Sequence, residues 1–330
     1  AAIGSALNST KEPGVPIREL QERLARRIQM EFEVERMEPL FASEAEYNAF
    51  ISRHAKHQVP VKDLATYKGK AFLGIDAGST TTKAALVGED GTLLYSFYHN
   101  NEGEPLGTTI TAIKDIYSQL PEDVEIVHSC STGYGEALIK AALMLDEGEV
   151  ETVAHYYAAS FFEPDVDCIL DIGGQDTKVI TVEGGMASSF LMNDKCSAGT
   201  GKFLEIMANR LGVDLPELFA LVEQGEPLAI SSMCTVFAES EVISHIGAGE
   251  RREDIAAGVV DSVVSKGAGL CARHTIQGDV LLTGGLCDSA YLVQRLSQRL
   301  GATVYTDPMG RYAGALGAAL IARGKRGREA

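Results

Sequence analysis

Basic residues are scarce in this chain of 330 residues, which has 29 lysines and arginines against 46 aspartates and glutamates. A formal net charge of -17 offers no basic surface to a phosphate backbone, so the composition excludes a general nucleic-acid binder. A single anionic ligand can still be held by backbone amides and a few local cations. Any nucleotide site must therefore be built within a pocket.

Long hydrophobic runs are also missing. No stretch approaches the roughly 18 consecutive apolar residues of a transmembrane helix, and the first residues lack the pattern of a secretory signal. With 45% hydrophobic and 23% charged residues, the composition is typical of a folded globular protein. We expect a cytoplasmic protein that binds neither a membrane nor nucleic acid.

Closely spaced cysteine pairs are absent as well. The six cysteines are spread along the chain, which does not fit a disulfide framework and predicts thiols or metal ligands. Cys130, Cys168, Cys271 and Cys287 lie among apolar or small residues. These four are predicted to be core thiols.

The sequence changes character near residue 70. Before it, apolar spacing predicts a surface helix within 17–40 and a second helix over 43–57, followed by a linker over 58–69. After it, strands, glycine-rich turns and helices alternate, and one strand-turn-strand pattern occurs twice. This repetition predicts a duplicated α/β fold.

Both strand-turn-strand units carry an acid followed by glycine. Residues 74–83 (GIDAGSTTTK) place Asp76 at a strand end, and residues 171–176 (DIGGQD) repeat the design with Asp171. Such hairpins direct backbone amides and hydroxyls to one point, which suits phosphate oxygens, while a carboxylate suits hydrated Mg²⁺. Either unit alone could be an ordinary hairpin. The nucleotide-binding candidates are Gly78, Ser79, Thr80, Thr81, Thr82, Lys83, Gly173, Gly174 and Gln175, and the catalytic candidates are Asp76, Asp171 and Gln175.

A third glycine turn follows the apolar residues 280–282, where Gly284 and Gly285 offer a backbone approach suited to ribose and adenine. Three such units in this order resemble the actin-like ATPase superfamily of sugar kinases, actin and the large heat-shock chaperones. No Walker A or Rossmann pattern competes. The resemblance implies an α/β, ribonuclease H-like duplicated fold whose two lobes close on ATP and Mg²⁺.

Domain limits follow from the same resemblance. The glycine- and alanine-rich segments 199–208 and 314–322 look like the helices that connect the lobes. The opening seven residues echo residues 314–320 and the chain starts without methionine, which predicts one module of a larger fused protein. The predicted limits are a helical extension and linker over 1–69, an actin-like ATPase over 70–324 (lobe I about 70–165 plus the C-terminal helix, lobe II about 166–310) and a tail over 325–330.

Two cysteine segments are the most particular part of the sequence. Cys196 within 192–204 and Cys234 within 231–244 are each followed by a helix-like run. Each thiolate is therefore predicted at a helix N-terminus, where the dipole favours anionic sulfur. Two thiolates cannot complete a four-ligand cluster within one chain, whereas a twofold dimer supplies four. The alternative is a pair of buried cysteines that act as small hydrophobes.

Both segments, with the Asp171 loop before them, resemble the activator ATPases of 2-hydroxyacyl-CoA dehydratases and the related BadF/BadG/BcrA/BcrD-type ATPases. The resemblance implies a homodimer in which one 4Fe-4S cluster bridges the subunits through Cys196 and Cys234. It also implies that ferredoxin or flavodoxin supplies an electron, and that ATP hydrolysis drives its transfer to a 2-hydroxyacyl-CoA dehydratase or a double-cubane cluster protein. Glu205 and Arg311 are further nucleotide-site candidates, although Arg311 stands where the family pattern has Gln.

Two other functional classes fit the phosphate loops. A small-molecule, sugar-type kinase would need an insert that binds its acceptor and would hold no iron, and an ATP-responsive regulatory module would need no catalysis. His155, His245 and His274 are isolated in the sequence and are predicted to be packed or solvated. The sequence does not define the residue that positions the hydrolytic water.

Overall fold

The computed structural model describes residues 16–19, 41, 43–54, 58–193, 195–274, 276 and 278–329, with the backbone alone for 326–329. Residues 1–35 and 36–330 form two separate units, and the fold described here belongs to the second. Of the predicted helix within 17–40, residues 17–19 are helical and the rest lies outside the described residues.

The first sheet has five strands in the order β3-β2-β1-β4-β5. In β1 (Gly69–Ala77) the last seven residues are all buried, as expected for a central strand that is covered on both faces. β2 (Thr81–Gly88) and β3 (Leu93–Asn100) form antiparallel pairs, while β4 (Val124–Thr132) and β5 (Glu147–Gly148) continue the sheet in parallel.

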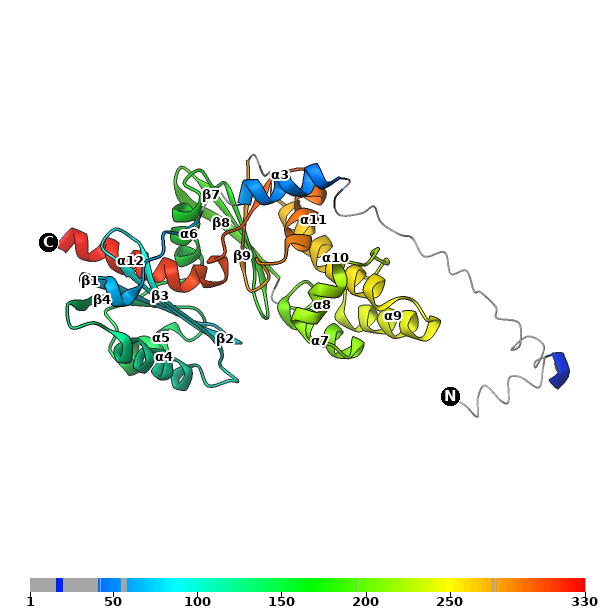
Figure 1. Cartoon of the computed structure of the whole chain (residues 1–330), viewed down its shortest axis with the longest axis horizontal. Helices are drawn as coiled ribbons and strands as arrows, with labels where there is room; N and C mark the ends of the chain where they lie inside the picture. The colour runs from blue at the N-terminus through cyan, green and yellow to red at the C-terminus, as the bar shows by residue number, and fades with distance from the viewer. Residues whose placement is uncertain are drawn as a thin grey trace. The chain divides into compact units, whose positions relative to one another are not determined.

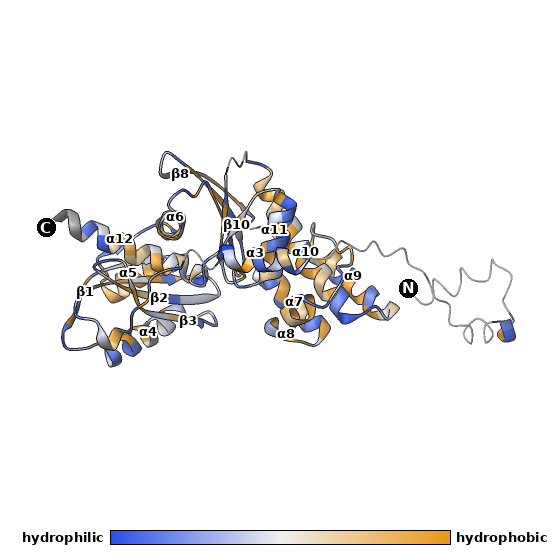
Figure 2. Ribbon diagram, turned by 45° about the horizontal axis from the view of Figure 1, so that its top comes forward, coloured by the Kyte–Doolittle hydropathy of each residue, from blue (hydrophilic) through white to orange (hydrophobic). Residues whose placement is uncertain are grey.

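Two layers of helices cover this sheet (Figure 1). On one face, α4 (Pro105–Gln119) and α5 (Glu136–Leu143) bury apolar side chains against β1 and β2. On the other face lie α6 (Glu151–Phe162) and α12 (Ala313–Glu329). Helix α4 carries both hydrophobic and hydrophilic residues along its length, as a helix with one buried side does (Figure 2).

The second sheet repeats the first. Its order is β10-β9-β6-β7-β8, with antiparallel pairs on one side of β6 and parallel pairs on the other. This is the topology of the first sheet, which confirms the predicted duplication. Its strands are β6 (Cys168–Ile172), β7 (Thr177–Glu183), β8 (Met186–Asn193), β9 (Val280–Gly284) and β10 (Val304–Tyr305).

A group of helices lies between β8 and β9 in the chain. The centre of this group is α10 (Arg252–Cys271), most of whose residues are buried. Its neighbours are α7 (Gly201–Leu211), α8 (Leu215–Val222), α9 (Thr235–Ala248) and, after β9, α11 (Ala290–Leu300). No helix among the described residues is long and apolar enough to cross a bilayer.

The helix that joins the two sheets is α6, not residues 199–208. α6 leads from β5 to β6, and α12 returns from the second sheet to pack on α6 and β1. A Cβ at Gly317 would lie 1.8 Å from the carbonyl oxygen of Ala154, so α12 and α6 cross at a distance that only glycine allows. Residues 199–208 belong instead to α7 and the turn before it. Small residues permit close packing of any helix, so they do not by themselves identify a helix that connects the lobes.

The segment 58–69, predicted as a linker, is packed along the first sheet. Leu93 donates its amide to Pro60 O at 2.8 Å and accepts from the Lys62 amide at 2.9 Å. The apolar side chains of Leu64 and Tyr67 are buried, which explains why this segment is ordered. The preceding helix α3 (Glu44–His54) starts after Ser43, as expected. The predicted domain limits themselves stay predictions.

Candidate functional site

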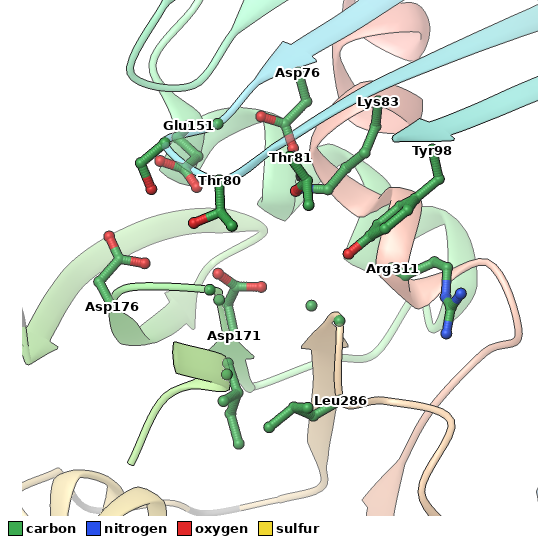
Figure 3. A pocket seen from close by; sticks show the side chains of 18 of the residues that line it. Asp76, Thr80, Thr81, Lys83, Tyr98, Glu151, Asp171, Asp176, Leu286 and Arg311 are labelled. Atoms are coloured by element: carbon green, nitrogen blue, oxygen red, sulfur yellow. Dashed lines mark hydrogen bonds and ion pairs between the residues drawn. The ribbon is translucent and has the colours of Figure 1, made fainter. Parts of the chain in front are cut away.

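One pocket collects residues from both sheets. It is lined by the β1–β2 turn, the β6–β7 turn, the first residues of α6 and α7, and the glycine turn after β9. Side chains from the two sheets point toward the same space (Figure 3). The predicted residues that line it are Asp76, Gly78, Ser79, Thr80, Thr81, Lys83, Asp171, Gly173, Gly174, Glu205, Gly284, Gly285 and Arg311.

The two acid-glycine hairpins have the same turn geometry. Gly78 donates its amide to Thr81 O at 3.0 Å, and Gly173 donates its amide to Asp176 O at 2.9 Å. The two turns face each other closely, since a Cβ at Gly174 would lie 2.8 Å from Thr80 Oγ1. This leaves a narrow space between two turns of matched shape.

Each hairpin also pairs its acid with a lysine on the next strand. Asp76 lies opposite Lys83, and Asp171 lies opposite Lys178, in the registers of the two strand pairs. Sequence analysis overlooked Lys178. The signal was present, because the spacing Asp-x-Gly-x-x-x-Thr-Lys occurs in both hairpins.

Asp76, the first acid, is buried, and among the described residues only one of its two carboxylate oxygens has a hydrogen-bond partner. Lys83 Nζ lies 2.8 Å from Asp76 Oδ2, and although burial opposes the charge, this carboxylate raises the pKa of Lys83 well above its usual value. Asp76 Oδ1 is buried and has no hydrogen-bond partner among the described residues. A Cβ at Gly133 or Gly314 would lie 2.6 or 2.5 Å from an oxygen of this carboxylate. The free oxygen and the bare glycines around the carboxylate fit a hydrated cation.

The second acid is held in its ionised form. Thr283 Oγ1 donates to Asp171 Oδ1 at 3.0 Å, and His155 Nδ1 lies 3.6 Å from the same oxygen. Burial opposes ionisation, but the charges of His155, Lys178 and Lys83 outweigh it and lower the pKa of Asp171. His155 is buried, as expected. Although it is isolated in the sequence, in the structure it lines the pocket beside Asp171.

Glu151, the first residue of α6, is a site residue that sequence analysis missed. Its Oε1 lies 3.0 Å from Lys178 Nζ and 3.8 Å from His155 Nε2. Burial raises the pKa of Glu151 even though Lys178 opposes the shift. Glu151, His155 and Asp171 bring ligand atoms within 4.8 Å of one another, so they could also hold a divalent cation. No local pattern identifies Glu151, because only the fold brings α6 to the phosphate turns.

Two predicted residues do not line the pocket. Thr82 is fully buried within β2, and Gln175 is exposed on its turn. Its neighbour Asp176 faces inward instead, accepting from Tyr134 at 2.9 Å and pairing with Lys178 at 3.0 Å. The catalytic roles of Asp76, Asp171 and Gln175 stay predictions.

A different part of the pocket combines apolar surface with one cation. Leu215 and Leu286 line it, and the Arg311 guanidinium lies 5.3 Å from the centre of the Tyr98 ring. Arg311 also pairs with Asp288. A purine base is flat, so it can stack on a guanidinium group and pack against apolar side chains. This part of the pocket therefore suits a purine base.

The two cysteines predicted as metal ligands meet at the start of one helix. Cys234 is the N-cap residue of α9, as predicted. The expectation that Cys196 begins its own helix is wrong, because α7 starts at Gly201, after a turn. Instead, Cys196 Sγ lies 3.8 Å from Thr235 Oγ1 in the first turn of α9. Backbone amides of Ala198 and Thr235 lower the pKa of the Cys196 thiol, which favours a thiolate.

The other four cysteines are buried, which confirms the prediction of core thiols. Burial raises the pKa of Cys130 and of Cys287 to about 12. Cys196 and Cys234, by contrast, are partly exposed. This pair is therefore available to a ligand shared with another molecule.

Hydrogen bonds connect the pocket to the cysteines. The first amides of α7, those of Gly201 and Lys202, donate to the carbonyls of Gly173 and Gly174 at 3.0 and 2.8 Å. Just before the helix, Thr200 donates its amide to Ser197 O at 3.1 Å. Ser197 in turn contacts the first turn of α9. A movement of the β6–β7 turn would therefore be transmitted to the loop of Cys196 and the start of α9 through a short chain of hydrogen bonds.

Comparison with known proteins agrees with this architecture. Residues 73–322 match the model of the BadF/BadG/BcrA/BcrD ATPase family. The chain is 40% identical over 252 residues to the (R)-2-hydroxyglutaryl-CoA dehydratase activating ATPase of Acidaminococcus fermentans, which covers 76% of this chain and 96% of the relative.

Two solved structures share the fold. The crystal structure of component A of the Acidaminococcus fermentans (R)-2-hydroxyglutaryl-CoA dehydratase has a TM-score of 0.72 at 39% identity, covering 78% of this chain and 100% of that chain. The activator of the 2-hydroxyisocaproyl-CoA dehydratase from Clostridium difficile, with bound ADPNP, has a TM-score of 0.72 at 33% identity, covering 78% and 96%. With the two mixed five-stranded sheets, these similarities confirm the predicted actin-like fold.

Proposed function

The chain belongs to the BadF/BadG/BcrA/BcrD ATPase family, and from this membership and the site we propose that it is an ATP-dependent, low-potential electron donor that activates a dehydratase-type partner. One observation carries the proposal. A pocket with two matched phosphate turns is hydrogen-bonded, through the start of α7, to two partly exposed cysteines at the start of α9.

The pocket would bind ATP with Mg²⁺. The two glycine turns would hold the phosphates through their backbone amides, as oriented amides do in other anion sites. The unsatisfied oxygen of Asp76 is suited to water around Mg²⁺. Gly284 and Gly285 would leave room for the ribose, and Leu286 and Arg311 would contact the adenine. ADPNP, the nucleotide in the activator from Clostridium difficile, is an ATP analogue.

Hydrolysis requires a group that orients a water molecule against the terminal phosphate. Glu151 is suited to this role because its carboxylate lies at the pocket between Lys178 and His155. A carboxylate whose pKa is raised by burial is a better proton acceptor near neutral pH than an ordinary one. Asp171 would stay ionised, and Glu151 and Asp176 would hold Lys178 in place.

Cys196 and Cys234 would hold half of a 4Fe-4S cluster, and a second copy of the chain would supply the other two thiolates in a homodimer. The residues fit this group, since both cysteines are partly exposed, lie at one helix N-terminus and include a thiol of lowered pKa. Such a cluster supplies a one-electron redox centre at the subunit interface. The protein's contribution is to couple this interface to nucleotide closure through Gly173, Ser197 and Thr235.

The partners follow from the family. The relatives are named as activators of 2-hydroxyacyl-CoA dehydratases, so the acceptor would be such a dehydratase or a double-cubane cluster protein. The electron would come from ferredoxin or flavodoxin, in the cytoplasm.

Anaerobic purification tests this function directly. We expect ATPase activity together with about four irons and four sulfides per dimer, as a single 4Fe-4S cluster requires. Nucleotide turnover without any iron would overturn the electron-donor assignment and favour a small-molecule kinase. ATP binding without turnover would favour a regulatory module.

A further inference from the structure

A groove beside the two cysteines is lined by positive charges. Lys195, Lys266 and Arg273 line it, and no aspartate or glutamate does so among the described residues. Lys195 precedes Cys196, Lys266 lies on α10, and Arg273 follows the C-terminal end of that helix. The helices α9 and α10 pack against each other.

These three cations line one groove of an acidic protein. The chain has a net charge of -17, and other arginines of the helices around α10 are paired with acids, as Arg210 is with Glu239 and Arg299 with Asp261. Within the described part of the chain, Lys195, Lys266 and Arg273 form no such pair. The exposed charges of Lys195 and Arg273 therefore remain available to an external acidic group, while the Lys266 charge also contributes to the lowered pKa of Cys196.

The groove adjoins both cysteines. Met233, which precedes Cys234, lines it, and so does Asn193, whose side-chain amide donates to Cys196 O at 3.1 Å. The Lys266 stem lies against the Cys196 loop, since a Cβ at Gly199 would be 2.5 Å from Lys266 Cγ. A molecule bound in the groove would thus lie beside the proposed cluster ligands.

We propose that this cationic groove, lined by Lys195, Lys266 and Arg273, docks the acidic face of a one-electron carrier protein. This inference rests on the proposed function, because it needs the cluster between the subunits. In the docked pair, one electron leaves the reduced carrier, which is oxidised by one electron, and the cluster is reduced by one electron. No bond is made or broken.

The lining favours a protein over a small anion. Lys195 and Arg273 are exposed long side chains, and Met192 and the exposed Met233 give the groove apolar surface. Apolar patches with a charged surround are typical of protein interfaces, and charges of this kind mainly accelerate the encounter of the two proteins. A small anion would need a more enclosed set of donors than these exposed cations provide.

The experiment uses the anaerobically purified, cluster-loaded dimer and a reduced acidic ferredoxin as the probe. The variant is Lys195→Glu/Arg273→Glu, and the matched control is Lys70→Glu/Lys114→Glu, which makes the same change in net charge at exposed positions on β1 and α4. Lys266 is left unchanged because it packs on the Cys196 loop. Two quantities are measured across ionic strength: the ferredoxin dissociation constant and the rate of cluster reduction by ferredoxin.

We expect the groove variant to bind ferredoxin at least about tenfold more weakly at low salt and to be reduced correspondingly more slowly, with the difference shrinking as salt screens the charges. The control should match wild type. Equal binding and reduction in both variants would overturn the inference, as would a loss confined to dimerisation or to transfer toward the acceptor. Binding of inorganic phosphate at low millimolar concentration that is lost in the groove variant, with ferredoxin binding unchanged, would assign the groove to a small anion instead.

Failure of the proposed function is separate from failure of the docking site. Iron content and reduction by dithionite, which needs no docking, report on the cluster itself. If wild type holds no iron, the proposed function fails. If iron content and dithionite reduction are normal in all proteins but the groove variant binds ferredoxin like wild type, only the docking site is overturned.

Discussion

The hydroxyl oxygens of Ser197 and Thr235 lie 3.0 Å apart, and this contact joins the loop of Cys196 to the helix that Cys234 caps. Ser197 also accepts from Thr200 through its carbonyl, just before α7 meets the second phosphate turn. The two proposed cluster ligands are thus held by one small hydrogen-bonded unit that touches the nucleotide pocket. This arrangement makes Thr235 a positioning residue.

Thr235→Val should uncouple the pocket from the cluster, because it removes the hydroxyl and keeps the shape of the side chain. We expect near-normal iron content and ATP binding, but a smaller ATP-dependent shift of the cluster's redox potential. Thr235→Ser restores the hydroxyl and should recover the shift. Potentiometric titration with and without nucleotide measures it, and an unchanged shift in Thr235→Val would remove this role.

Replacing either proposed ligand should abolish the cluster while sparing the pocket. Cys196→Ser and Cys234→Ser are each expected to lose the visible absorbance and to weaken dimerisation, because cubane clusters usually take four thiolates and the dimer would keep only two. ATP binding should survive. Cys271→Ser is a control at a buried thiol that should keep the iron. A cluster retained in the Cys196→Ser/Cys234→Ser double variant would contradict the bridging assignment.

Local sequence signals predicted what lies within single hairpins. Acid, glycine and hydroxyl residues at fixed spacing marked the turns of Asp76 and Asp171, and the structure brings these turns together. Glu151 could not be predicted in this way, because its role depends on α6 reaching the turns from elsewhere in the fold. Cys196 shows the same limit, since its partner helix α9 begins far along the chain.

Asp76→Asn should strongly reduce hydrolysis, because the amide replaces the carboxylate expected to hold hydrated Mg²⁺. It also leaves the partly buried Lys83 without its ion-pair partner, and breaking a fully buried pair typically costs about 3–5 kcal/mol. We therefore expect a lower melting temperature as well as lost ATPase activity. Adding Lys83→Met should recover part of the stability but not the activity. Normal turnover in Asp76→Asn would reject Asp76 as a catalytic residue.

Glu151→Gln should lower kcat by about 10²–10⁴, the usual contribution of general acid–base catalysis, with nucleotide affinity retained. Since burial raises the pKa of Glu151, wild-type activity should rise with pH through a value above the ordinary carboxyl range. The Lys178 charge lowers this pKa, so Lys178→Met should move the acid limb to higher pH. Steady-state ATPase measurements across pH test the loss of kcat and the shift of the acid limb. An acid limb that stays at the same pH in Lys178→Met would exclude Glu151 as the group that titrates there.

The last prediction concerns the crossing of α6 and α12, the two helices that cover one face of the first sheet. Gly317→Ala would place a methyl group 1.8 Å from the Ala154 carbonyl oxygen, and since that oxygen belongs to a helix backbone, no side-chain rotation can relieve the overlap. We expect a loss of about 3 kcal/mol or more, at or beyond the upper end of ordinary overpacking.

Gly324→Ala on the same helix is the matched control. No atom lies within 4 Å of its added Cβ, so alanine should stabilise the helix by about 0.5–1 kcal/mol through its higher helix propensity. The two substitutions add the same methyl group but are expected to change the stability in opposite directions. The comparison therefore separates the clash at the helix crossing from the general effect of alanine on a helix. Thermal unfolding measures both. A melting temperature that is unchanged or higher in Gly317→Ala would show that α12 does not pack on α6 this closely.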